Sequence, residues 1–202
     1  GGVGIDHLEC SLDGTSFSAC TSPVQFTSAN ITDGTHTFEV LSVDNSTNKD
    51  PSPASFTWTV DTTPPATSIN SATDGNKSAV TNGGPTKSTS ITFTFSGTDT
   101  GGVDHFECSL DNSNFTMCIS PIQFTSVNLD DGTHTFRVLS EDNSTNKDPS
   151  PATFTWTVDT VSPSTTVVSA IDGNSTSRQA DGKSSSNSMT FAFSANDTAG
   201  DE

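Results

Sequence analysis

Apolar and basic residues are both scarce in this chain. Only 29% of its 202 residues are hydrophobic. No apolar run reaches the roughly 18 residues that a membrane-spanning helix needs. Seven basic residues face 24 acidic ones, which gives a formal net charge of −17. Because that charge repels phosphate backbones and anionic lipids alike, we expect no nucleic acid as a partner and no membrane insertion.

Residues that favour helices are also few, and tyrosine is absent. The chain contains 32 Ser, 34 Thr and 13 Phe. Threonine and phenylalanine favour strands, whereas the helix-forming Ala, Leu, Glu, Lys and Arg are under-represented. The composition therefore predicts an all-β protein.

The sequence repeats with a period of 98 residues. Residues 5–61 align with 103–159 without a gap, and 42 of the 57 positions are identical. The same offset places ITFTFSGTD at 91–99 on MTFAFSAND at 189–197. A period of this length is the size of a small domain and exceeds that of a solenoid unit.

Short segments of each repeat alternate apolar and polar residues, which is the pattern of a half-buried strand. Turn-forming DG, NG, GG and Pro segments separate them. In the full repeat the expected strands are 66–70, 90–97, 103–110, 115–118, 122–128, 133–141 and 153–159. Seven strands without a helix predict tandem immunoglobulin-like β-sandwich modules of about 98 residues each.

The strand alternation also predicts which side chains form the core of the complete module. The expected core residues are Phe93, Phe95, Phe106, Leu110, Phe124, Phe136, Val138, Phe154, Trp156 and Val158. Their alternating neighbours are expected to face solvent.

The repeat predicts three modules of unequal completeness. Residues 1–61 supply the third to seventh strands of a partial module, residues 62–159 a complete module, and residues 160–202 the first two strands of another partial module. Joined tail to head, the two partial modules make one whole. We therefore expect the partners to be copies of the chain or adjacent modules, joined head to tail.

Several motifs recur in both long repeats. They are F-x-C-S-L-D or its variant L-E-C-S-L-D, a second Cys ten residues later, S-P, D-G-T-H-T-F and a closing W-T-V-D-T. The chain resembles the immunoglobulin-like repeats that occur in tandem in large bacterial and archaeal surface proteins. That resemblance implies an extracellular, modular and non-enzymatic protein on a cell surface or in a secreted filament, and it implies no particular ligand.

Cysteine spacing predicts one local disulfide per repeat. Cys10 and Cys20 enclose nine residues, as do Cys108 and Cys118. The alternative, a zinc site, lacks the closely spaced second pair of ligands that such sites use. Disulfides indicate an oxidising compartment.

The loops DNSTNKD at 44–50 and 142–148 offer oxygen ligands, with Asp44, Asp50, Asp142 and Asp148 as the calcium candidates. They lack the glycine and the terminal Glu of an EF-hand, and a polar turn is the alternative interpretation. No other cofactor is expected. Glycosylation acceptors of the form N-x-S/T occur at Asn30, Asn45, Asn76, Asn114, Asn143, Asn174 and Asn196.

No arrangement of catalytic residues stands out. Paired carboxylates in an apolar setting, a nucleophile elbow and a phosphate loop are absent, so we expect no catalytic residue. His36 and His134 lie at strand entries in G-T-H-T-F and are expected to be structural.

The sequence thus predicts a structural stalk or filament protein, and the alternative is an adhesin that binds a glycan or a protein through module loops. The 15 differences between the aligned repeats are scattered or conservative. A dedicated binding module is expected to carry one divergent, aromatic loop, which favours the structural role.

Overall fold

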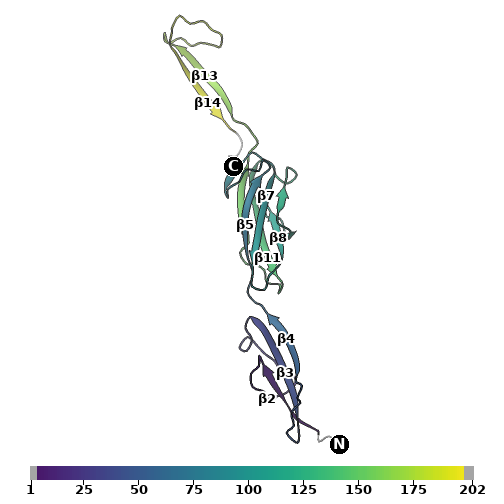
Figure 1. Ribbon diagram of the computed structural model, residues 1–202. Coiled ribbons are helices and arrows are strands. Elements are labelled where there is room, and N and C mark those ends of the chain that lie inside the picture. Colours follow the sequence, from purple (N-terminus) through teal and green to yellow (C-terminus); the bar gives the residue numbers. More distant parts are fainter. Residues whose placement is uncertain (1–3, 198–202) are drawn as a thin grey trace. The chain divides into compact units, whose positions relative to one another are not determined.

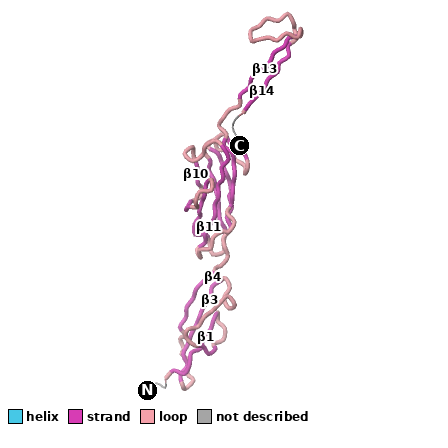
Figure 2. Tube along the Cα trace, turned by 180° about the vertical axis from the view of Figure 1, so that it is seen from behind, coloured by secondary structure: helices cyan, strands magenta, loops and turns pink. Residues whose placement is uncertain are grey.

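The computed structural model describes residues 4–197, and these residues form strands, turns and loops only. Figure 2 shows this in two colours, magenta strands joined by pink loops. Within the described range there is no helix, and hence none that could cross a membrane. The prediction of an all-β protein built from tandem β-sandwich modules is confirmed.

Residues 66–158 form a β-sandwich, which we call the sandwich (Figure 1). One sheet has the strand order β10-β7-β5, and the other has the order β6-β12-β11-β8-β9. The strands are β5 (Ala66–Asp74), β6 (Gly84–Thr86), β7 (Ile91–Thr98), β8 (Val103–Leu110), β9 (Thr116–Cys118), β10 (Ile122–Phe124), β11 (Gly132–Asp142) and β12 (Ala152–Val158).

The core of the sandwich is aromatic. Phe93 is fully buried, and its ring lies 4.4 Å from that of Phe136, 5.2 Å from that of Phe154 and 5.3 Å from that of Trp156, measured between centroids. Offset and edge-to-face ring pairs of this kind stabilise a core beyond the area that they bury.

Most of the expected core is buried, and the structure adds residues to it. Phe106, Leu110 and Phe124 are only partly buried and pack on the rim of the cluster. The buried residues that the alternation did not single out are Ala72, Val80, Ile91, Cys108 and Leu129.

Three strands differ from expectation, and one of them is β5, which was expected over 66–70 and extends to Asp74. The segment expected at 122–128 is a strand only over Ile122–Phe124, because only these residues pair with β7. Strand β6 was not expected, since Gly84–Thr86 shows no alternation, and it exists because it pairs in parallel with β12.

The N-terminal repeat forms a single sheet with the order β2-β1-β3-β4, which we call the open sheet. Its strands are β1 (Ile5–Leu12), β2 (Ser18–Cys20), β3 (Gly34–Asp44) and β4 (Ala54–Val60). They correspond to β8, β9, β11 and β12 at the offset of 98 residues. The register of β1 on β2 equals that of β8 on β9, and the register of β3 on β4 equals that of β11 on β12.

The last repeat forms a two-stranded hairpin of β13 (Ser164–Asp172) and β14 (Met189–Asn196), joined by a long loop over residues 173–188 (Figure 1). We call these residues together the hairpin. At the repeat offset, β13 corresponds to β5 and β14 to β7.

By contacts, the chain divides into two compact units. The first runs to Ala66 and includes Gly97–His105 and Ser140–Pro149, and the second comprises Thr67–Ser96, Phe106–Leu139 and the segment from Ser150 onward.

Candidate functional site

Both cysteine pairs lie close enough to be bonded. The sulfur atoms of Cys10 and Cys20 are 2.06 Å apart, and those of Cys108 and Cys118 are 2.03 Å apart. Each bond joins two neighbouring strands of the same sheet, β1 to β2 and β8 to β9. Each therefore closes a local turn and does not link two sheets.

The carboxylates of Asp44 and Asp142 organise the loops in which calcium was expected. Asp142 accepts hydrogen bonds from the Ser144 and Asn146 backbone N–H groups and from the Asn146 side-chain amide, all at 2.8 Å. Burial raises the pKa of Asp142, but these hydrogen bonds outweigh burial and hold the pKa below its usual value. Asp44 accepts the equivalent bonds, and those from Asn48, followed by that from Ser46, lower its pKa.

Within residues 4–197, only one of the four calcium candidates belongs to a group of three acidic side chains. Asp142 lies with Asp61 and Asp99, and the carboxylate oxygens of the three are within 4.8 Å of one another. Asp50 instead accepts a hydrogen bond from the Ser52 N–H at 2.8 Å, and Asp148 is buried. The sequence pattern missed Asp61 and Asp99 because they lie on separate segments, far from the loop in sequence.

His36 and His134 hold the turn before their strands. The Nε2 of His36 lies 2.6 Å from the Thr32 carbonyl, and its Nδ1 lies 2.8 Å from Asp13 Oδ2. A carbonyl and a carboxylate can only accept, so these two contacts favour the protonated imidazole, in which both ring nitrogens donate. The hydrogen bond to Thr32, followed by that to Asp13, raises the pKa of His36.

His134 repeats this arrangement with the Asp130 carbonyl at 2.8 Å and with Asp111 at 2.7 Å. Burial lowers its pKa, but the two hydrogen bonds outweigh burial and raise the pKa above the usual value. Both ring nitrogens of each histidine thus contact acceptors within the fold, which is a structural role.

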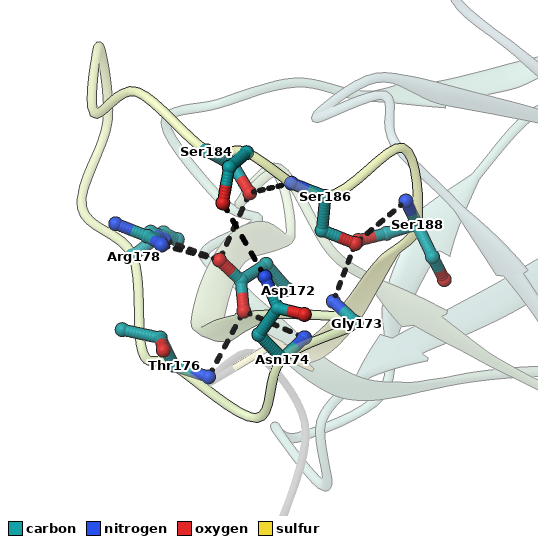
Figure 3. A network of polar contacts seen from close by, with 9 residues as sticks. Asp172, Gly173, Asn174, Thr176, Arg178, Ser184, Ser186 and Ser188 are labelled. Carbon is teal, nitrogen blue, oxygen red and sulfur yellow. Dashed lines mark hydrogen bonds and ion pairs between the residues drawn. The ribbon is translucent and has the colours of Figure 1, made fainter.

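The loop of the hairpin is organised around Asp172, whose side chain is buried (Figure 3). Its Oδ1 accepts the Asn174 and Thr176 N–H groups at 3.0 Å. Its Oδ2 accepts from Arg178 Nε at 2.7 Å and from the Ser184 hydroxyl at 2.9 Å. The Thr176 hydrogen bond, with the Arg178 and Ser184 bonds, lowers the pKa of Asp172 to about 2.

All seven glycosylation acceptors are exposed. They lie in turns, in loops and at the end of β14, and they are Asn30, Asn45, Asn76, Asn114, Asn143, Asn174 and Asn196. Exposure is what a transferase requires of an acceptor, and it does not by itself distinguish one from another.

A hollow of about 330 Å³ lies beside the second disulfide. Cys108, Cys118, Ile122 and Phe124 line it together with Met117. Met117 is 74% exposed, and two further apolar side chains, Ile119 and Val127, are 80% and 89% exposed. In the open sheet the three equivalent residues are Ala19, Thr21 and Ala29, so this apolar surface is specific to the sandwich.

No protein-family model and no curated protein matches the chain. Several solved structures are similar to it, including the following two. The fibronectin(III)-like modules of CbhA from Clostridium thermocellum match with a TM-score of 0.39 and 15% identity, over 77% of this chain and 78% of that one. A tetra-tandem repeat in the extending region of a large adhesion protein matches with a TM-score of 0.32 and 11% identity, over 96% of this chain and 56% of that one.

Proposed function

We propose that this chain is a non-enzymatic, extracellular structural repeat protein whose immunoglobulin-like modules join head to tail into a stalk or filament on the cell surface. The observation that carries this proposal is the faithful repetition of one module. The disulfide, the histidine–aspartate pair and the aspartate-centred turn all recur with the same partners.

The pairing of β6 with β12 suits a module that bears load. The two strands are parallel, with Gly84 opposite Trp156 and Thr86 opposite Val158. Because the strands are parallel, force that reaches β6 from its N-terminal side and β12 from its C-terminal end drags them in opposite directions, which loads the ladder in shear so that its hydrogen bonds share the force. The Gly83 N–H bond to Thr155 and the Asp159 N–H bond to Thr86, at 2.8 and 2.9 Å, extend this ladder.

Force spectroscopy on the full chain tests the structural role. We expect one discrete unfolding event for the sandwich, which releases roughly 20–30 nm of chain at about 3.5 Å per residue. Reduction should lengthen that event by about 3.5 nm, because it frees the segment between Cys108 and Cys118. A chain that extends smoothly, without a discrete event, is a flexible linker and contradicts the proposal.

The extracellular assignment is supported by the cysteine pairs and by the acidic, hydroxyl-rich composition. Non-reducing peptide mapping of protein taken from its native cells tests the assignment. Free thiols at all four cysteines would contradict it.

A second function, adhesion, is favoured by the apolar side chains beside the second disulfide. Exposed apolar surface next to a hollow is typical of a binding site. A glycan array with the chain, and with its Met117→Ala/Ile119→Thr variant, separates the two functions. Binding that this variant abolishes would favour an adhesin, and absence of binding would favour the structural role.

A further inference from the structure

The hairpin exposes an apolar face that its counterpart in the sandwich buries. Phe191 and Phe193 are 57% and 73% exposed, and Met189 is 39% exposed. The equivalent residues of β7 are Phe93 at 0%, Phe95 at 4% and Ile91 at 0%.

The open sheet likewise leaves exposed an apolar face that the equivalent strands of the sandwich have covered. Phe56 on β4 is 67% exposed, whereas its equivalent Phe154 is 8% exposed. A hollow of about 190 Å³ also opens on the sheet, lined in part by Leu8, Cys10, Phe38 and Val40. In the sandwich the ring of Phe95 lies 5.1 Å from Phe106 and 6.0 Å from Phe136, the equivalents of Leu8 and Phe38.

Two strands of the sandwich have equivalents that are not strands. Residues 24–26 correspond to β10, which pairs with β7, and residues 182–184 correspond to β6, which pairs with β12. Within the described residues neither segment is a strand. The partner of the first would be a β14, and the partner of the second would be a β4.

We propose that the open sheet is a docking site for the hairpin of a second copy of this chain, which completes a sandwich between the two copies. The sandwich itself is the precedent, because there the equivalents of β13 and β14 cover the equivalents of β1, β3 and β4. This inference rests on the proposed function and names the partner and the surface that it uses.

In this interface each copy inserts one aromatic side chain into a hollow on the other copy. Phe193 of the hairpin fills the hollow on the open sheet, as Phe95 fills the equivalent space in the sandwich. Trp58 of the open sheet enters a hollow of about 600 Å³ on the hairpin, lined in part by Ala170, Gly182 and Phe191. In the sandwich the equivalent Trp156 is fully buried, pairs with Gly84 and packs on Phe93.

One of the substitutions between the hairpin and its counterpart places a charge at a buried apolar position. Arg178 stands where the sandwich buries Val80, which is 8% exposed. The guanidinium is already paired with Asp172 inside the hairpin, at 2.5 Å from Nη2 to Oδ2. Docking therefore brings in a charge together with its own partner, and no unpaired charge becomes buried.

The contact joins two different surfaces, the hairpin of one copy and the open sheet of the next. Every assembly therefore still has a free sheet at one end and a free hairpin at the other, to which a further copy can bind. A contact of this kind builds open chains unless its geometry closes a ring. Each copy carries a formal charge of −17, so like-charge repulsion opposes association and added salt should strengthen it.

The first test measures the size of the full chain by sedimentation velocity, over a range of concentrations and salt. We expect species larger than a monomer, growing with concentration. Phe193→Asp and Phe56→Asp each place a carboxylate in the interface, and because both side chains are exposed, neither change should unfold the chain. Val127→Asp is the matched control, since it adds the same charge at a site 89% exposed on the sandwich.

Mixing the two variants gives the sharper result. Each variant alone should be monomeric, whereas the mixture should form a 1:1 dimer, because the intact hairpin of one docks on the intact sheet of the other. That dimer has one damaged surface at each end and should not grow. The Val127→Asp chain should associate like the unmodified chain.

A crosslink tests the register. The Gln123–Thr92 pair of the sandwich corresponds to Gln25 of one copy opposite Thr190 of the other. Gln25→Cys with Thr190→Cys should give disulfide-linked chains under oxidation, whereas Gln25→Cys with Thr166→Cys should not.

Three results would overturn the proposal. They are a chain that stays monomeric at every concentration and salt, association that the Phe56→Asp and Phe193→Asp changes leave intact, and a closed dimer sensitive to Phe193→Asp alone. None of them bears on the discrete unfolding event under force, so this inference can fail while the structural role stands.

Discussion

The sandwich and the open sheet are built from nearly the same sequence, yet only one of them has an aromatic core. Of 57 aligned positions 42 are identical, and the four strands of the open sheet recur in the sandwich. Phe154 is nevertheless 8% exposed, whereas the identical residue at position 56 is 67% exposed. The difference is the facing sheet, because β5, β7 and β10 cover the strands of the sandwich. Burial here is a property of the partner strands and not of the residue.

The local hydrogen-bonded turns are the same in both regions. His36 and His134 hold their turns through the same pair of partners, and Asp44 and Asp142 accept bonds from equivalent donors. Contacts between residues close in sequence, or on paired strands, form whether or not a second sheet is present.

The largest expected effect comes from truncating the equivalent phenylalanines. Phe154→Ala should lower the free energy of unfolding by about 3–5 kcal/mol, because it leaves a cavity in a packed core. Phe56→Ala should change it by no more than about 0.5 kcal/mol, since that side chain is already exposed. Chemical denaturation at low protein concentration measures both, and equal losses would contradict the comparison.

Removing a disulfide should lower the free energy of unfolding by a smaller amount, and by a similar amount in both regions. Each bond closes a loop with a sequence separation of 10, which contributes about 2.5–3 kcal/mol in the chain-entropy model. Cys10→Ser/Cys20→Ser and Cys108→Ser/Cys118→Ser are therefore matched variants. Cys108 is 5% exposed, so any additional loss of unfolding free energy in the second variant, relative to the first, measures the packing of Cys108.

The change of stability with pH should be a smaller effect still. Because the folded-state pKa of His36 and His134 lies above the usual value near 6.5, their stabilising effect is fully present below that value. It is lost as the pH rises through the folded-state pKa. We expect the melting temperature to fall from mildly acidic to mildly alkaline pH, and His36→Gln and His134→Gln to flatten that dependence.

Calcium is expected to have the smallest effect, and only on one of the two equivalent loops. Asp142 lies among other carboxylates, whereas Asp44 belongs to no such group in the described range 4–197. Added calcium should slow amide exchange over 142–148 and leave 44–50 unchanged. Protection of both loops, or of neither, would contradict the expectation, and addition of EDTA is the control.

Much of the fold could be predicted from the sequence because strand alternation and the repeat are local or periodic signals. They placed seven of the strands of the sandwich and ten of its core residues, although Phe106, Leu110 and Phe124 lie at the rim. Leu129 was missed because it follows a turn and lies outside the alternating segments. The grouping of Asp61 and Asp99 with Asp142 was missed because it joins distant segments.

What the sequence by itself determined is therefore the set of local structures, the paired strands, the disulfide turns and the aspartate-centred loops, which need only neighbours in the chain or on an adjacent strand. What only the tertiary structure decided is which faces are covered. Ile122–Phe124 forms β10 because it pairs with β7, while the nearly identical Val24–Phe26 forms no strand. A strand at a sheet edge needs a partner for its backbone groups, and no pattern within three residues can supply one.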